Sequence, residues 1–121
     1  MRSTCPISQT LEILGDRWTL LIIRDLMFFG KSQYKEFLSS PEKISTNILA
    51  DRLKRLEQSG IIEKTSYQDN PPRYEYHLTS KGADLRPLMR EVTTWGLEHI
   101  ENTEIPLDAL NKETSKNESP D

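Results

Sequence analysis

The residues best suited to chemistry lie along one face of a short amphipathic segment, TNILADRLKRLEQ. At about 100° per residue its leucines share one stripe and its polar side chains share the opposite face, which predicts a helix. Asn47 on the polar face can pair with adenine through two hydrogen bonds, and Thr46 and Ala50 beside it are expected to face bases as well. Lys54 and Arg55 can contact phosphate groups. For this helix alone, the alternative is a solvated amphipathic helix whose lysine and arginines only keep the chain soluble. A surface that reads double-stranded DNA becomes the prediction when the hairpin that follows is taken with it.

A second basic position follows a stiff turn. The segments IIEKTSY and RYEYHLT alternate on either side of DNPP, which predicts a β-hairpin. Pro71 and Pro72 restrict the turn, so Arg73 would lose less entropy on docking against a phosphate or in the minor groove. The alternative for Arg73 is a cross-strand ion pair with Glu63, which a hairpin would permit.

Apolar spacing and capping residues predict the elements that position these side chains. The predicted helices are 7–14 ended by Gly15, a largely buried helix between Asp16 and Gly30, 32–39, and 46–58 capped by Ser45. Helix, turn, helix and hairpin in this order predict a winged helix-turn-helix, an α+β fold that is mainly α. Three further lysines, at 31, 35 and 43, would add contacts to the DNA backbone.

Length and charge bound the function. A chain of 121 residues predicts one domain, expected over 1–100, followed by an acidic tail over 101–121 that is expected to be disordered. The net charge is −3, but two lysines against six acids give the tail −4, so the domain carries +1. Basic residues gather at Arg52, Lys54, Arg55, Lys64 and Arg73.

The N-terminus and the apolar runs bear on localisation. No segment approaches the roughly 20 apolar residues that span a bilayer, and the first residues lack the apolar region of a signal peptide. The sequence therefore predicts a cytoplasmic protein without membrane contact.

Catalytic and metal sites find little support. His77 falls in a predicted strand and His99 near a helix end, without a second ligand or acid–base partner at metal or triad spacing. No glycine-rich phosphate loop is present either. The sequence predicts neither an enzyme nor a metal or cofactor site.

Three segments, in a fixed order, carry a resemblance to a known family. CPISQTLEILGDRWTLLIIRDL, ISTNILADRLKRLEQSGIIEK and YQDNPPRYEYHLTSKG resemble the HxlR-type regulators, a branch of the MarR-like winged-helix transcription factors, over about residues 5–100. The resemblance implies a homodimeric bacterial or archaeal DNA-binding regulator, often responsive to oxidants or electrophiles. Many members carry arginine or lysine where this chain has Asn47. Asparagine favours adenine and arginine favours guanine, so a different base preference is expected.

The C-terminal segment TSKGADLRPLMREVTTWGLEHI predicts a helix with an apolar stripe, which Pro87 would either kink or open. In similar proteins this helix packs with the first helix of a second chain. The interface residues implied by the resemblance are Ile7, Leu11, Leu88, Val92 and Trp95. The alternative is that the stripe folds back on the chain's own core. A two-fold dimer would place its two copies of helix 46–58, the recognition helix, about 34 Å apart and would favour a near-palindromic operator.

Cys5, the single cysteine, lies just before the first helix, where the helix dipole favours thiolate. In redox-sensing relatives of the resembled family a cysteine at this place reacts with oxidants, so the resemblance implies Cys5 as a sensor. The alternative is a small apolar residue at the dimer contact.

Two functional hypotheses remain. One is a dimeric, sequence-specific transcription regulator, with repression by promoter occupancy as the expected mode. The other is a winged-helix module that contacts proteins without binding DNA. Basic residues at 54, 55 and 73 favour the first hypothesis, because a protein-binding module would tolerate acids there. The sequence names no small-molecule effector and no target gene.

Overall fold

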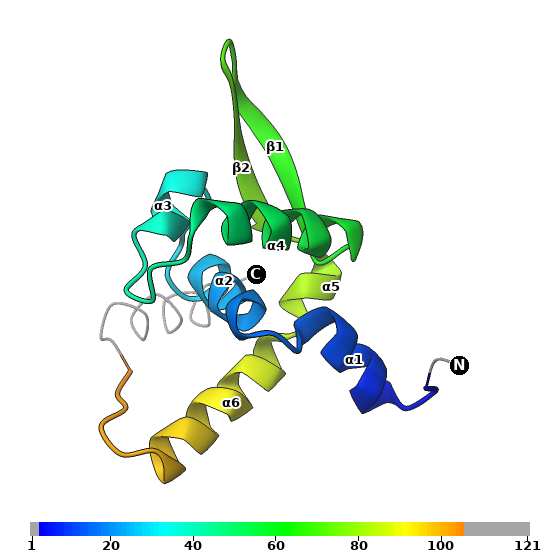
Figure 1. Ribbon diagram of the computed structural model, residues 1–121, viewed down its shortest axis with the longest axis vertical. Helices are drawn as coiled ribbons and strands as arrows, with labels where there is room; N and C mark the ends of the chain where they lie inside the picture. The colour runs from blue at the N-terminus through cyan, green and yellow to red at the C-terminus, as the bar shows by residue number, and fades with distance from the viewer. Residues whose placement is uncertain (1–2, 106–121) are drawn as a thin grey trace, which may run out of the picture.

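The fold is a winged helix-turn-helix, as the sequence predicts (Figure 1). The computed structural model describes residues 3–105. Its elements are α1 (Pro6–Leu14), α2 (Arg17–Met27), α3 (Tyr34–Leu38), α4 (Thr46–Gln58), β1 (Ile62–Asp69), β2 (Pro72–Leu78), α5 (Ser80–Ala83) and α6 (Arg86–His99). The predicted class, α+β and mainly α, is confirmed: the only sheet within these residues is the hairpin of β1 and β2.

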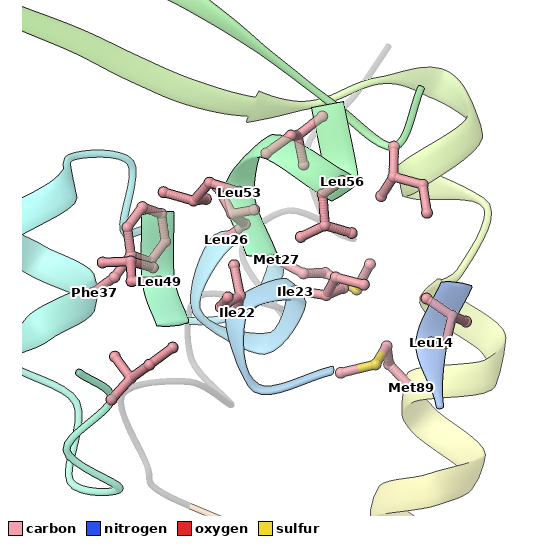
Figure 2. Close-up of a cluster of buried hydrophobic side chains, with 13 residues drawn as sticks. Leu14, Ile22, Ile23, Leu26, Met27, Phe37, Leu49, Leu53, Leu56 and Met89 are labelled. Carbon is pink, nitrogen blue, oxygen red and sulfur yellow. The ribbon is translucent and has the colours of Figure 1, made fainter. Parts of the chain in front are cut away.

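The core forms where α4 crosses over α2. Leu49, Leu53 and Leu56 of α4 are buried against Ile23 and its neighbours on α2, and Figure 2 shows the two sets of side chains facing each other. Full burial of an aliphatic side chain contributes about 1.5–3 kcal/mol, so three leucines hold α4 firmly in place. The polar face of α4 is thereby turned outward.

The two predicted N-caps, Asp16 and Ser45, are present, whereas Gly15 ends α1 for a reason other than a left-handed conformation. The Asp16 carboxylate accepts from Trp18 N–H at 3.0 Å, and the Ser45 hydroxyl accepts from Ile48 N–H at 3.2 Å. Gly15 ends α1 at φ −82°, outside the left-handed region. A Cβ at Gly15 would instead collide with the carbonyl oxygen of Leu11, so close packing requires glycine there.

Two helices are shorter than the sequence predicts. α2 ends at Met27 because the chain turns at Gly30, with φ 66°, and Lys31 N–H reaches the Asp25 carbonyl at 3.0 Å. α3 begins at Tyr34 because the two preceding residues bond to the hairpin, and Gln33 is extended. Gln33 bridges Glu75, and the Ser32 carbonyl accepts from Tyr76 N–H at 2.8 Å.

The hairpin is longer than predicted. β1 and β2 pair antiparallel as far as Asp69 and Pro72, which leaves only Asn70 and Pro71, joined by a cis peptide bond, in the turn. A bulge at Tyr67 shifts the register between Ser66 and Gln68. The hairpin projects well beyond α4, which is the geometry of a wing (Figure 1).

The predicted C-terminal helix is two helices. α5 ends at Ala83, and Pro87 lies in the first turn of α6, so the proline opens the main helix and does not kink it. None of the helices described is long and apolar enough to cross a membrane. The predicted acidic tail lies largely outside the described residues, apart from 101–105.

Candidate nucleic-acid interface

The outward face of α4 presents all of the predicted helix contacts to solvent. Thr46, Asn47, Ala50, Lys54 and Arg55 are exposed. The structure therefore gathers the residues predicted to read bases and those predicted to bind phosphate on one helix. Such a face can enter the major groove, which admits an α-helix.

Ion pairs divide the basic residues of α4 into two groups. Arg52 donates from Nε to the Asp16 carboxylate at 2.7 Å and from Nη1 to Asp51 at 2.5 Å. Arg55 lies 3.8 Å from the same Asp51 carboxylate. Lys54 has no ion pair or side-chain hydrogen bond within residues 3–105. Arg52 thus braces the fold, whereas Lys54 is available to a phosphate.

The brace between Asp16 and Arg52 has an electrostatic signature. Partial burial acts to raise the pKa of Asp16, but hydrogen bonds from Arg52, the Thr19 hydroxyl and Trp18 N–H outweigh it and lower that pKa to about 2. The carboxylate at the start of α2 thereby fixes the middle of α4. The sequence gives no hint of this pair, because 36 residues separate its members.

Arg73 lies on the wing next to the turn. It pairs across the hairpin with Gln68, whereas Glu63 pairs with His77. The alternative of an Arg73–Glu63 ion pair is therefore wrong, since the two residues lie at opposite ends of the hairpin. Arg73 is exposed and has no ion pair within residues 3–105, so its guanidinium is free to meet a phosphate.

A groove of about 420 Å³ separates α4 from the wing. Lys54 reaches it from α4 and Lys64 from β1, with the rings of Tyr34 and Tyr76 also in its walls. Lys64 also lies 4.6 Å from the Tyr74 ring centre. When a helix occupies the major groove and a wing reaches the neighbouring minor groove, the sugar–phosphate strand between them passes over such a groove. Two lysines suit that strand.

The lysines near α3 differ in availability. Lys35 and Lys43 are exposed, but the Lys31 ammonium donates to the Ser40 hydroxyl at 2.7 Å. Lys31 therefore serves an internal contact, which sequence reasoning missed.

The apolar residues predicted for a dimer contact are exposed in the chain. Ile7 is 71% exposed and Leu11 57% on α1, and Trp95 is 60% exposed on α6, where Leu88 and Val92 are also exposed. Only Met89 of α6 is buried in the core. The α6 stripe thus packs on its own core at Met89, whereas Leu88, Val92 and Trp95 do not. α1 and α6 extend on the side opposite the wing (Figure 1).

Cys5 is the N-cap residue of α1 and is exposed. Its backbone N–H donates to the Ser3 hydroxyl at 3.1 Å, and its carbonyl accepts from Gln9 N–H at 3.0 Å. The guanidinium of Arg17, the first residue of α2, lies over the Trp18 ring at 4.7 Å from its centre.

The two histidines have structural neighbours. The His77 ring lies 3.3 Å from the Thr65 hydroxyl across the hairpin, and the His99 ring packs on Trp95 with 4.9 Å between ring centres. Among residues 3–105, no three His, Cys, Asp or Glu side chains cluster to hold a metal ion.

The recognition helix, the wing and their exposed cations define a DNA-binding regulator of the winged helix-turn-helix class. The chain belongs to the HxlR-like helix-turn-helix family, whose sequence profile it matches over residues 13–104. It is a transcriptional regulator of the helix-turn-helix type, and its relatives are transcription regulators.

Three relatives illustrate the match. The HTH-type transcriptional regulator sll1512 of Synechocystis is 34% identical over 97 residues, which cover 80% of this chain and 71% of that protein. The transcriptional regulator YodB of B. subtilis in its reduced form has a TM-score of 0.66 at 35% identity, over 84% of this chain and 100% of YodB. The redox regulator HypR in its reduced form has a TM-score of 0.73 at 29% identity, over 80% of this chain and 95% of HypR.

Proposed function

We propose that the chain is a homodimeric, sequence-specific repressor that places α4 in the major groove and the wing on the flanking backbone. Thr46, Asn47 and Ala50 face the bases, and Lys54, Arg55 and Arg73 contact the sugar–phosphate backbone. The observation that carries the proposal is that Lys54 and Arg73, on the two elements that flank the groove, are exposed and have no ion-pair partners within residues 3–105. Lys64 joins them as a phosphate contact because it lines the same groove.

Homodimerisation is supported by the exposed apolar residues of α1 and α6. Ile7, Leu11 and Trp95 are each more than half exposed, and solvation of such a surface is unfavourable. A second copy covers both helices through a two-fold interface. The two α4 helices then address half-sites about 34 Å apart in a near-palindromic operator, and the bound dimer excludes polymerase from the promoter.

Cys5 is proposed as the sensor of this repressor. The similarity to HypR, a redox regulator, and to YodB, which has also been crystallised after diamide treatment, supports a thiol response. The exposed position of Cys5 leaves its sulfur accessible to oxidant. Two Cys5 thiols give up two electrons and two protons to diamide and form one disulfide across the dimer. Alternatively, one Cys5 and one small thiol give up the same two electrons and two protons to diamide and form a mixed disulfide.

The decisive experiment is selection of duplexes from a random library by the purified protein, followed by gel-shift binding at two salt concentrations with and without diamide. A repressor of this kind enriches a near-palindromic sequence with salt-sensitive affinity. If no sequence is enriched and no duplex is bound at low salt, the result would favour the alternative that the winged helix contacts proteins and does not bind DNA.

Asn47→Ala refines the assignment of α4. Loss of a bidentate adenine contact lowers discrimination at one base position by about 1–3 kcal/mol and leaves binding to unrelated duplexes unchanged. A uniform loss over all duplexes would make Asn47 a backbone contact.

A further inference from the structure

A partly buried charged cluster joins α2 to the connection between α3 and α4. Asp25 is only 3% exposed, and its carboxylate accepts from Arg24 Nη2 at 2.8 Å and from the Ser40 hydroxyl at 2.5 Å. Ser40 in turn accepts from Lys31 Nζ at 2.7 Å. Arg24 also donates through both terminal nitrogens to the Glu42 carboxylate, at 2.7 and 2.9 Å. These five residues form what is called here the Asp25 cluster.

The Asp25 cluster is charge-balanced, with two cations and two anions. The bond from Arg24 lowers the pKa of Glu42, although partial burial opposes it. The Ser40 hydroxyl accepts from Lys31, so its own proton is directed at the Asp25 carboxylate. Buried ion pairs contribute less to stability than well-packed apolar side chains do, but their directional bonds fix geometry.

The cluster joins α2 to the chain just before α4. Arg24 and Asp25 lie on α2, whereas Ser40 and Glu42 lie in the connection that leads to Ser45, the N-cap of α4. Lys43 in this connection has φ 59°, and its N–H donates to the Ser40 carbonyl at 3.0 Å. Three residues separate Glu42 from Thr46, so displacement of Glu42 displaces the first turn of α4.

We propose that the Asp25 cluster is a positioning device for the first turn of α4, which sets base selectivity without touching DNA. This inference rests on the proposed function, because it assumes that the start of α4 reads bases. Thr46 and Asn47 lie in that first turn, and base contacts require placement to within a fraction of an ångström, whereas phosphate contacts by long cations tolerate more. Loss of the cluster therefore lowers selectivity more than it lowers general DNA affinity.

The test compares Ser40→Ala with Ser39→Ala, a matched control. Ser39 is the exposed neighbour, and within residues 3–105 its hydroxyl bonds only the Glu36 carbonyl, to which it donates at 2.7 Å. We expect Ser40→Ala to lower the ratio of affinities for the wild-type-selected duplex and a scrambled duplex about tenfold, as loss of one base contact does. Amide exchange at Lys43 and Ile48 should accelerate. Ser39→Ala should leave both measurements within about twofold of wild type. An unchanged ratio or unchanged exchange in Ser40→Ala overturns the proposal.

A second pair of variants guards against misfolding of Ser40→Ala. Glu42→Gln keeps the shape of a half-buried side chain and removes its charge, and Glu101→Gln makes the same change at an exposed position. The first should reproduce the fall in selectivity with a cooperative melt, and the second should not. Equal selectivity in the two variants rejects the cluster as a positioning device. Failure of the wild-type chain to select any duplex would instead reject the proposed function, while the exchange measurement would still report on the connection.

Discussion

Replacement of Asp16 by asparagine isolates the brace between α2 and α4. Asparagine can still accept from Trp18 N–H, so the helix cap survives, whereas the ion pair with Arg52 at 2.7 Å is lost. The Asp16 pKa falls from 3.8 to about 2 in the fold. At 1.36 kcal/mol per pKa unit this corresponds to about 2 kcal/mol, and solvent screening of the partly exposed pair lowers it to about 1–2 kcal/mol.

The pH dependence has a definite sign. Because folding lowers the Asp16 pKa, its stabilisation is complete above pH 4 and is lost as the pH falls toward 2. At pH 7 the variant should therefore unfold at about 0.5–1 M less urea than wild type, measured at one fixed chain concentration. By pH 3 about half of the difference should be gone.

The control is Asp84→Asn, since Asp84 makes no side-chain hydrogen bond or ion pair within residues 3–105. Its urea midpoint should match wild type at both pH values. Equal midpoints for Asp16→Asn and wild type at pH 7, or a gap just as wide at pH 3, would refute the brace.

Three further predictions concern the wing, the thiol and the dimer surface. Arg73→Ala should weaken binding to every duplex and reduce the salt slope by about 0.9, and an unchanged slope would remove the wing from the interface. Cys5→Ser should give no disulfide-linked dimer on a non-reducing gel after diamide. A band that persists would be an artefact, because the chain has a single cysteine. Trp95→Asp should leave the fold intact, since Trp95 is 60% exposed, and shift the sedimentation mass to the monomer at micromolar concentration. An unchanged mass would exclude the α6 surface from the dimer interface.

Local signals predicted the recognition helix well. The bounds Thr46–Gln58 follow from the Ser45 cap, the spacing of the three leucines and Gly60, which adopts φ 77° just beyond the helix end. All of these signals lie within a few residues of the helix, so the sequence alone specifies it. The outward face followed directly from the same periodicity.

Contacts between distant residues were not predictable. Arg52 reads in sequence as one more basic residue of the DNA-facing helix, but its partner Asp16 lies 36 positions away. Asp25 sits in the apolar run TLLIIRDLMFF, and its partner Ser40 lies 15 positions on. The start of α3 was misplaced for the same reason, because Ser32 and Gln33 are held by bonds to the wing. Each error arose from a pairing that only the fold creates.

The attachment of the wing to residues 32 and 33 has a mechanical consequence. Thr65 pairs with the attached Glu75, and five residues, Thr65–Asp69, lead from there to the turn. The free part of the wing is therefore about 16 Å long, so a rotation of about 8° at the attachment would move the tip by about 2 Å. A displacement of that size would be enough to break a proposed contact between Arg73 and a phosphate. The bond from Tyr76 N–H to the Ser32 carbonyl and the bridge from Gln33 to Glu75 hold the edge of β2 that does not pair with β1. The loop that follows Gly30 therefore supports the wing and determines where its tip lies.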